Sequence, residues 1–256
     1  MRIERLNVGW FTAPGGIFRR GDDLDHAVRF PVPAYVIETA TERILVDTGL
    51  NPEAIADPGA YYDRPETFAM FALEQEQSVA EQVDVATLTK VVLTHLHWDH
   101  VGGLQLIPAS APVVVQRSEW QAGQDDAAAR RNSFIPRDYA EDGREVILID
   151  GDFDLLGDGS IELLLTPGHT PGHQSVRIGD LVLGGDVTHY ASGLDDHRFP
   201  VFADDHERQG RSADRLRAMR DAGLDVVPGH DPEILRPGPV VARSTKLQLP
   251  GRSDPA

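Results

Sequence analysis

The chain has 256 residues, of which 41% are hydrophobic and 7% aromatic, and its 41 acidic and 24 basic side chains give a formal net charge of −17. This length suits one domain with one large core, so we expect residues 1–256 to form a single domain. The negative surplus repels phosphate backbones and anionic lipids, which argues against nucleic acid and membranes as partners. Because the chain contains no cysteine, any transition-metal site must use histidine and carboxylate ligands.

The two ends of the chain carry simple expectations. Residues 1–11 have no apolar run after their charges, and no stretch of about 18 apolar residues occurs anywhere, so we expect a cytoplasmic protein without a membrane span. The last residues, 249–256, are rich in proline, glycine and charge, and we expect a frayed tail.

The first predicted element is a strand at residues 1–10, followed by a long loop at 12–33, where proline, glycine and charge occur without a clear period. Two short β-branched segments, 32–39 and 43–49, predict consecutive strands joined by a turn. Residues 66–83 contain no glycine or proline and carry apolar side chains at roughly helical spacing, which predicts a helix.

Strands dominate the rest of the chain. The apolar segment 89–94 predicts a buried strand that leads directly into the sequence HLHWDH. Further strands are predicted at 112–116, 145–149, 160–166, 175–178, 181–183 and 224–228, and a helix at about 205–222. Strands that recur throughout the chain, with helices between some of them, predict an α/β protein with two sheets.

Four metal-binding side chains crowd together after the buried strand: His95, His97, Asp99 and His100. On an extended segment, residues two apart point the same way, so His95 and His97 can face one point while a turn brings Asp99 and His100 to a second. Three imidazoles beside one carboxylate are poorly explained as a solvated loop, because protonated imidazoles would repel one another and a metal removes that penalty. We therefore interpret the segment as a metal site.

Three more candidates share one local pattern, an apolar strand followed by small residues and then a metal-binding side chain. They are His169 in LLLTPGH, Asp186 in LVLGGD and His230 in LDVVPGH. Taken singly, each could be a turn or capping residue. Taken together, they favour a metal site gathered along one edge of the two sheets.

Several other residues are left open. His173 either supports the site with a hydrogen bond or anchors its own turn, and Asp47 has the same two readings. His26, His197 and His206 have no partner pattern and are expected at the surface.

The order His-x-His-x-Asp-His, then TPGHTPGH, GGD and PGH, resembles the metallo-β-lactamase superfamily over residues 32–230. Within it, VPAYVIET with ILVDTG, LTHLHWDHVGG and TPGHTPGHQS are most similar to N-acyl homoserine lactonases. The resemblance implies an αββα sandwich, two mixed β-sheets flanked by helices, with the site at one edge.

The resemblance also implies two divalent metal ions per chain. His95, His97 and His169 would bind one ion, Asp99, His100 and His230 the other, and Asp186 would bridge them. Imidazole and carboxylate ligands suit zinc, which we expect, and also cobalt, manganese or iron.

One position departs from the lactonase pattern. Those enzymes usually place a tyrosine three residues after the bridging aspartate, and here that position holds His189, with Tyr190 next. Either His189 contacts the substrate carbonyl, or Tyr190 is swung in by a local bulge, or the substrate differs.

The expected reaction is hydrolysis of an N-acyl homoserine lactone, a quorum-quenching activity, by a metal-bridging hydroxide. Asp99 or Asp186 would pass a proton to the leaving alkoxide, with His189 or Tyr190 assisting at the carbonyl oxygen. The candidates for an apolar pocket that takes the acyl chain are residues 11–30, Trp98 and residues 190–202, including Phe199 and Phe202, and each of them could equally be packed in the core.

Other functions are compatible with the same motifs. An arylesterase or phosphotriesterase would need only a different pocket, and thioesterases of the glyoxalase II type share the metal motif. A metal-binding protein without turnover and a di-iron electron-transfer protein are more distant alternatives. We expect a small-molecule lactone or ester as the partner, and either a monomer or a homodimer.

Overall fold

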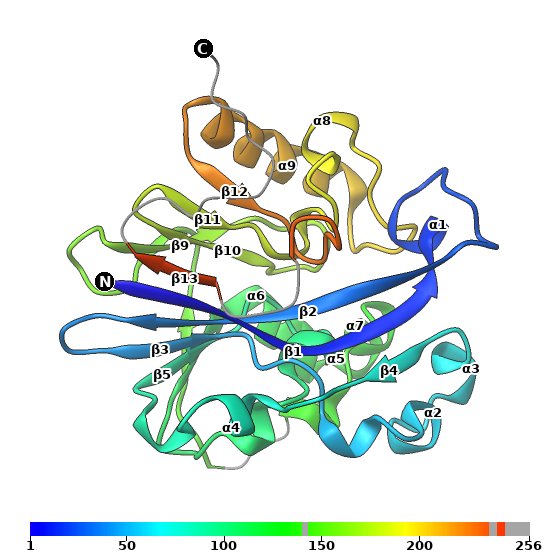
Figure 1. The fold of residues 1–256 in the computed structure, drawn as a ribbon, viewed down its shortest axis with the longest axis horizontal. Coiled ribbons are helices and arrows are strands. Elements are labelled where there is room, and N and C mark those ends of the chain that lie inside the picture. The colour runs from blue at the N-terminus through cyan, green and yellow to red at the C-terminus, as the bar shows by residue number, and fades with distance from the viewer. Residues whose placement is uncertain (140–142, 236–239, 244–256) are drawn as a thin grey trace.

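A computed structural model of the chain describes residues 1–139, 143–235 and 240–243, and it contains two β-sheets (Figure 1). The larger sheet has the order β13 (Val240–Arg243), β1 (Arg2–Pro14), β2 (Ala27–Glu38), β3 (Arg43–Val46), β5 (Lys90–Val92), β6 (Val113–Gln116) and β7 (Val146–Ile149), and β4 (Ala72–Glu74) also pairs with β1. The smaller sheet has the order β12 (Asp225–Val227), β11 (Leu181–Leu183), β10 (Gln174–Ile178), β9 (Ile161–Leu165) and β8 (Phe153–Asp154).

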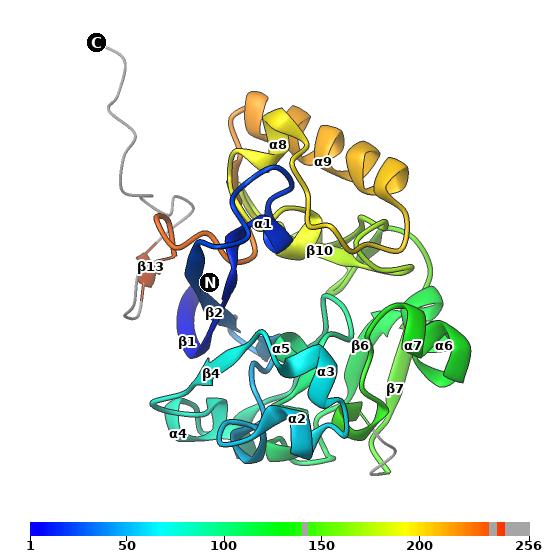
Figure 2. The same ribbon diagram turned by 90° about the vertical axis from the view of Figure 1, so that its right-hand side faces the viewer.

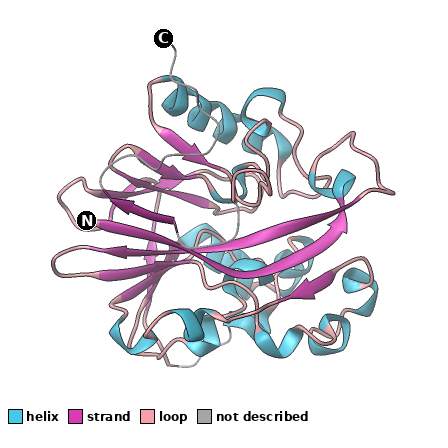
Figure 3. Cartoon of the chain, in the orientation of Figure 1, coloured by secondary structure: helices cyan, strands magenta, loops and turns pink. Residues whose placement is uncertain are grey.

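Helices lie above and below the strands in Figure 3, and others lie behind the strands in the middle of that view. The α-helices are α1 (Gly15–Phe18), α2 (Pro58–Tyr61), α3 (Pro65–Phe68), α4 (Val79–Gln82), α5 (Trp98–Val101), α6 (Arg117–Gln124), α7 (Asp126–Arg131), α8 (Gly193–Asp196) and α9 (His206–Asp221). Short 3₁₀ turns are η1 (Pro52–Ala54), η2 (Val85–Thr87), η3 (Leu104–Leu106), η4 (Pro136–Tyr139) and η5 (Gly185–Val187). Figure 2 shows α8 and α9 on one side of the sandwich and α2, α4, α6 and α7 on the other.

The alternation of side chains along the strands explains the layers. On β11, Leu181 and Leu183 face a core shared with Ile44 and Val92 of the larger sheet. Val182, between them, faces the opposite way and packs with residues of α8 and α9. Because successive side chains of a strand point to opposite faces, both faces of this sheet are covered. The predicted αββα sandwich with two mixed sheets is confirmed.

The predicted strands from residue 89 onward and the long helix α9 are observed to within about two residues, a normal uncertainty at element ends. The predicted strands at 1–10, 32–39 and 43–49 differ from β1, β2 and β3 by up to about five residues at one end. Two predictions for the first third of the chain are wrong. The predicted loop at 12–33 is reduced to residues 19–26, because β1 and β2 form a long antiparallel pair that continues to Pro14 opposite Ala27, and helix α1 follows β1. Pro31 and Pro33, which lack an N–H, pair near the irregularity in register between Asn7 and Trp10, where β-bulges tolerate proline.

The predicted helix at 66–83 is also wrong. The segment instead forms the end of α3, strand β4 and helix α4. Leu73, which was not among the apolar residues at helical spacing, pairs with Phe11 across β4 and β1 and is buried there, so tertiary pairing decides the structure of this segment. Ser78 begins α4 through a capping box with Glu81, a start signal that is visible in the sequence.

The predicted frayed tail, 249–256, lies outside the described residues. Among the residues that the structure describes, no helix is both long enough and apolar enough to cross a membrane.

Candidate metal centre

The HLHWDH segment leaves the end of β5, with His95 and His97 in the loop and Asp99 and His100 on the short helix α5. The glycines that follow allow this turn to pack closely. A Cβ at Gly102 would lie 2.4 Å from the carbonyl oxygen of Trp98 and 2.9 Å from that of Gly49. Since no side chain fits there, the HVGG sequence fixes the four candidate ligands against the strand end.

The three other predicted ligands arrive from the smaller sheet. His169 lies in the loop between β9 and β10, Asp186 lies in η5 just after β11, and His230 follows β12. All seven predicted side chains are less than a tenth exposed. The structure therefore brings together, along one edge of the sandwich, residues separated by up to 135 positions in the sequence.

One group of three imidazoles converges around His97. Its Nδ1 lies 3.0 Å from Nε2 of His95 and 3.0 Å from Nε2 of His169. These three ligand atoms lie within 4.8 Å of one another, close enough to hold one metal ion.

A second group comprises Asp99, His100 and His230. Nε2 of His100 lies 3.1 Å from Nε2 of His230, and Oδ2 of Asp99 lies 3.5 Å from the latter nitrogen. These ligand atoms also lie within 4.8 Å of one another.

Asp186 stands between the two groups. Its Oδ2 lies 3.4 Å from Nε2 of His169 and 3.9 Å from Nε2 of His95. Its Oδ1 lies 3.2 Å from Nε2 of His230 and 3.5 Å from Nε2 of His100, and it is buried without a hydrogen-bond partner. One carboxylate thus presents an oxygen to each group, the arrangement that a bridging ligand requires.

Hydrogen bonds to the ring nitrogens that face away from the cluster show which nitrogen of each histidine carries the hydrogen. Nε2 of His97 faces the carbonyl oxygen of Asn132 at 2.8 Å, and Nδ1 of His230 faces that of Pro31 at 2.8 Å. A carbonyl oxygen only accepts, so each of these nitrogens carries the hydrogen and the other nitrogen of each neutral ring turns a lone pair inward. Nδ1 of His100 donates in the same way to Oδ2 of Asp47, at 2.8 Å.

His95 follows the same rule through Thr94. The Thr94 hydroxyl donates to Oδ2 of Asp47 at 2.8 Å, so it accepts from Nδ1 of His95 at 3.0 Å. Inward lone pairs about 3 Å apart repel one another, and a cation among them would remove the repulsion. The donor set therefore fits metal ions in both groups.

The charges of the cluster shift the pKa values in opposite directions. Burial lowers the pKa of His95 and of His169 well below the usual value for histidine. Burial also disfavours the charged form of His100, but the carboxylates of Asp186, Asp47 and Asp99 outweigh it and raise the pKa of His100.

The two open readings of His173 and Asp47 are resolved by these contacts. Nε2 of His173 accepts the backbone N–H of Asp186 at 3.0 Å, and its Nδ1 lies 3.1 Å from the carbonyl oxygen of Thr166. His173 therefore supports the loop that carries Asp186. Asp47 orients His100, and its φ of 57° is a left-handed conformation that the bonds from Thr94 and His100 hold in place.

The residue three positions after Asp186 faces the same centre. Nε2 of His189 lies 3.3 Å from Oδ2 of Asp186, and burial lowers the pKa of His189 to about 3. Tyr190 instead packs against Phe30, at 5.9 Å between ring centres, and under the guanidinium of Arg19. No local bulge brings Tyr190 to the centre.

A cavity of about 260 Å³ opens above the cluster. Its lining residues are Ile17, Phe18, Thr67, Met70, Phe71, His97, Trp98, Asp99, Ser133, Asp186, His189, Val201 and Phe202. We call the seven clustered residues, His95, His97, Asp99, His100, His169, Asp186 and His230, the floor. We call the apolar lining residues Ile17, Phe18, Met70, Phe71, Trp98, Val201 and Phe202 the wall.

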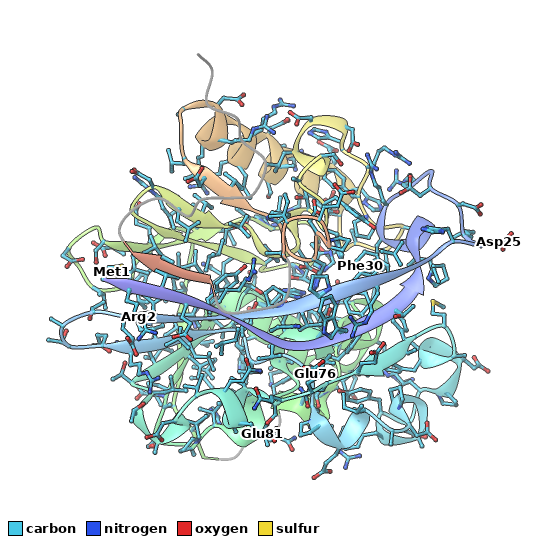
Figure 4. All side chains as sticks on the ribbon, viewed as in Figure 1. Met1, Arg2, Asp25, Phe30, Glu76 and Glu81 are labelled. Carbon is cyan, nitrogen blue, oxygen red and sulfur yellow. The ribbon has the colours of Figure 1, made fainter. Side chains whose placement is uncertain are left out.

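The wall was only partly predicted. Phe18, Trp98 and Phe202 line the cavity as expected, whereas Phe199 is buried in the core beside α8 and α9. Phe30 lies inward along the β1–β2 hairpin and Asp25 at its outer end (Figure 4), and Phe30 packs behind Phe18. Met70 and Phe71 were missed because they lie in the segment predicted as a helix.

Comparison with known proteins identifies relatives over nearly the whole chain. The family model for the metallo-beta-lactamase superfamily matches residues 27–230. An N-acyl homoserine lactonase, AttM, of Azorhizobium caulinodans is 29% identical over 229 residues, covering 84% of this chain and 86% of the relative. An N-acyl homoserine lactonase of Bacillus cereus is 28% identical over 250 residues, covering 90% and 89% of the two chains.

Solved structures agree on the fold. An N-acyl homoserine lactone hydrolase with N-hexanoyl-L-homoserine bound at its catalytic metal center has a TM-score of 0.79 at 23% identity, covering 90% of this chain and 93% of the other. AidC, a dizinc quorum-quenching lactonase, has a TM-score of 0.67 at 18% identity, covering 96% and 95%. With the family match spanning both sheets and every residue of the floor, the chain belongs to the metallo-β-lactamase superfamily.

Proposed function

We propose that this protein is a dinuclear metal-dependent hydrolase that opens the lactone ring of N-acyl homoserine lactones. One observation carries the proposal: Asp186 offers one carboxylate oxygen to each of two ligand groups, beneath a cavity with an apolar wall. The relatives named as N-acyl homoserine lactonases, which align over most of both chains, support the choice of substrate.

Two divalent metal ions, zinc in the first instance, would be held by the seven residues of the floor. When bound, they supply Lewis acidity, which polarises a carbonyl group and lowers the pKa of water. The inward lone pairs of His95, His97, His100 and His230 are already assigned by hydrogen bonds, so these rings need no reorientation to bind.

The chain's own groups would orient the lactone. His189 lines the cavity beside Asp186, where a ring N–H can donate to the carbonyl oxygen as it gains negative charge. Asp99 also lines the cavity, on the side of the second ligand group, where its carboxyl group can carry a proton to the leaving alkoxide. The products would be a hydroxyl group and a carboxylate.

The wall would take the acyl chain. Its aromatic members contact one another, with Phe18 and Phe202 5.5 Å apart and Phe71 and Trp98 5.4 Å apart between ring centres. Such a surface favours a flexible hydrocarbon chain over a charged group, because burying apolar area is favourable and burying an unpaired charge is not.

The experiment is proton release, followed with a pH indicator, when zinc- or cobalt-loaded protein meets an acyl homoserine lactone, paraoxon and a plain aryl ester. The proposal predicts lactone opening that is much faster than the other two reactions and is abolished by a chelator. Strong ester or phosphotriester turnover with little lactone opening would keep the hydrolase and reject the substrate.

A further inference from the structure

A glutamate outside the cavity lining connects the two loops that supply one ligand group. Glu119, on α6, is 0% exposed. Its Oε1 accepts the backbone N–H of Leu96 at 3.0 Å, and its Oε2 accepts the backbone N–H of Gly172 at 2.8 Å. Burying a carboxylate is costly, and these two hydrogen bonds offset part of that cost and hold the side chain in place.

The two donors belong to segments from different sheets. Leu96 stands between His95 and His97, after β5 of the larger sheet. Gly172 lies in the loop of His169, between β9 and β10 of the smaller sheet. The two oxygens of Glu119 therefore join these segments across the edge of the sandwich.

The contact between α6 and the second loop is tight. A Cβ at Gly172 would lie 2.3 Å from the backbone nitrogen of Glu119 and 2.7 Å from its Cβ, so only glycine lets the loop approach so closely. This close approach makes the position of the His169 loop depend directly on α6.

We propose that Glu119 is a positioning residue that holds His169 against His95 and His97 and thereby sets the metal affinity of that ligand group, without contacting the metal. The inference rests on the proposed function only in assuming that the floor binds metal. The other ligand group has its own carboxylate, because Asp47 accepts the backbone N–H of Thr94 at 2.8 Å and orients His100. Asp47 also reaches His95 through the Thr94 hydroxyl, so it supports ligands of both groups, whereas the two bonds of Glu119 go to loops of one group.

The test measures the zinc affinity of each ligand group separately, in a background variant in which the other group is disabled. A His230→Ala background disables the Asp99, His100 and His230 group, and a His169→Ala background disables the other. In each, zinc affinity is measured by competition with a chromogenic chelator, with and without Glu119→Gln. An amide in place of the carboxylate presents an NH₂ group to one of the two N–H donors.

The proposal predicts that Glu119→Gln weakens zinc binding at least about ten-fold in the His230→Ala background and less than about two-fold in the His169→Ala background. Asp47→Asn, the matched control, should weaken zinc binding in both backgrounds, because Asp47 supports His100 directly and His95 through Thr94. Equal effects in both backgrounds, or none in the first, would overturn the proposal. If Glu119→Gln does not fold by circular dichroism, Gly172→Ala tests the same contact.

The outcome is distinct from that of the proposed function. Wild-type protein that binds two zinc ions but opens no lactone would reject the substrate and leave the role of Glu119 open to the same test. Wild-type protein that binds no zinc would overturn both.

Discussion

The floor and the wall of the cavity are built in different ways. Four of the seven floor residues come from one six-residue segment, and the other three follow strand ends with nearly the same local sequence. The wall is assembled from α1, the turn that follows α3, α5 and the loop before α9. The floor is also tied by hydrogen bonds to backbone and carboxylate groups, whereas Met70, Val201 and Phe202 of the wall remain partly exposed.

This difference indicates which part of the function each region determines. Under the proposed function, the ligand types of the floor would determine the reaction class. Apart from Trp98, which lies between His97 and Asp99, the wall residues come from elements other than those that carry the floor. Substrate choice would then depend on the wall and on His189, which lies where the two regions meet.

The largest effect should follow loss of the shared carboxylate. Asp186→Ala removes an oxygen from both ligand groups, so lactone turnover should fall at least about a thousand-fold and bound zinc should fall as well. Activity is measured by proton release and zinc by mass spectrometry. Asp180→Ala, an exposed aspartate in the turn before β11, should behave like wild type. Full activity in Asp186→Ala would reject the floor as the reaction centre.

The next effect concerns the junction of floor and wall. His189→Phe should lower kcat/KM about ten-fold or more with zinc content unchanged, because a donor to the carbonyl oxygen is lost and no ligand of either group is removed. Tyr190→Phe is the matched control, since Tyr190 packs against Phe30 and does not line the cavity, and it should change kcat/KM less than about two-fold. The opposite ranking of these two variants would assign the carbonyl contact to Tyr190.

A smaller effect is expected in the wall. Phe202→Ala removes apolar area from the cavity mouth, which should raise KM several-fold for a lactone with a ten-carbon acyl chain and leave kcat and zinc content unchanged. A lactone with a four-carbon chain is the control and should show little change. An equal loss for both chain lengths would mean that Phe202 does not contact the acyl chain.

The last prediction compares the pKa shifts of two buried aspartates, Asp186 and Asp138. Burial opposes ionisation of Asp186, but His230, His189 and His100 outweigh it and lower the pKa of Asp186. At Asp138, burial outweighs the neighbours that favour the charged form, and it raises the pKa of Asp138 to about 7. The folded state then binds more protons than the unfolded state between about pH 4 and 7, so stability falls as the pH rises through this range.

Asp138→Asn should remove that loss. In chelator-treated wild type, ionisation of Asp138 should lower the free energy of unfolding by at most about 1.4 kcal/mol for each unit that the pH rises. Urea titrations at several pH values should show a smaller fall for the variant. An unchanged slope would show that Asp138 is charged in the folded protein at neutral pH.

The order of predicted strands and helices indicated an α/β protein with two sheets, and the resemblance to the metallo-β-lactamase superfamily implied the αββα layers. The repeated pattern of metal-binding side chains after strand ends selected the residues that the structure gathers at the floor. The sequence did not predict β4, because Leu73 is buried by pairing with a strand about 60 residues earlier, which no local period reports. Glu119 was missed for the same reason: a single glutamate on a helix resembles a surface residue until its two backbone donors are seen.

The most direct test of the dinuclear centre is the zinc content of purified, zinc-loaded protein, measured by mass spectrometry for wild type and for His230→Ala. A dinuclear centre predicts two zinc ions per wild-type chain and one per variant chain, because His230 lies with Asp99 and His100 and not with the group of His95, His97 and His169. A single zinc ion in wild type, with no further loss in His230→Ala, would contradict the dinuclear centre.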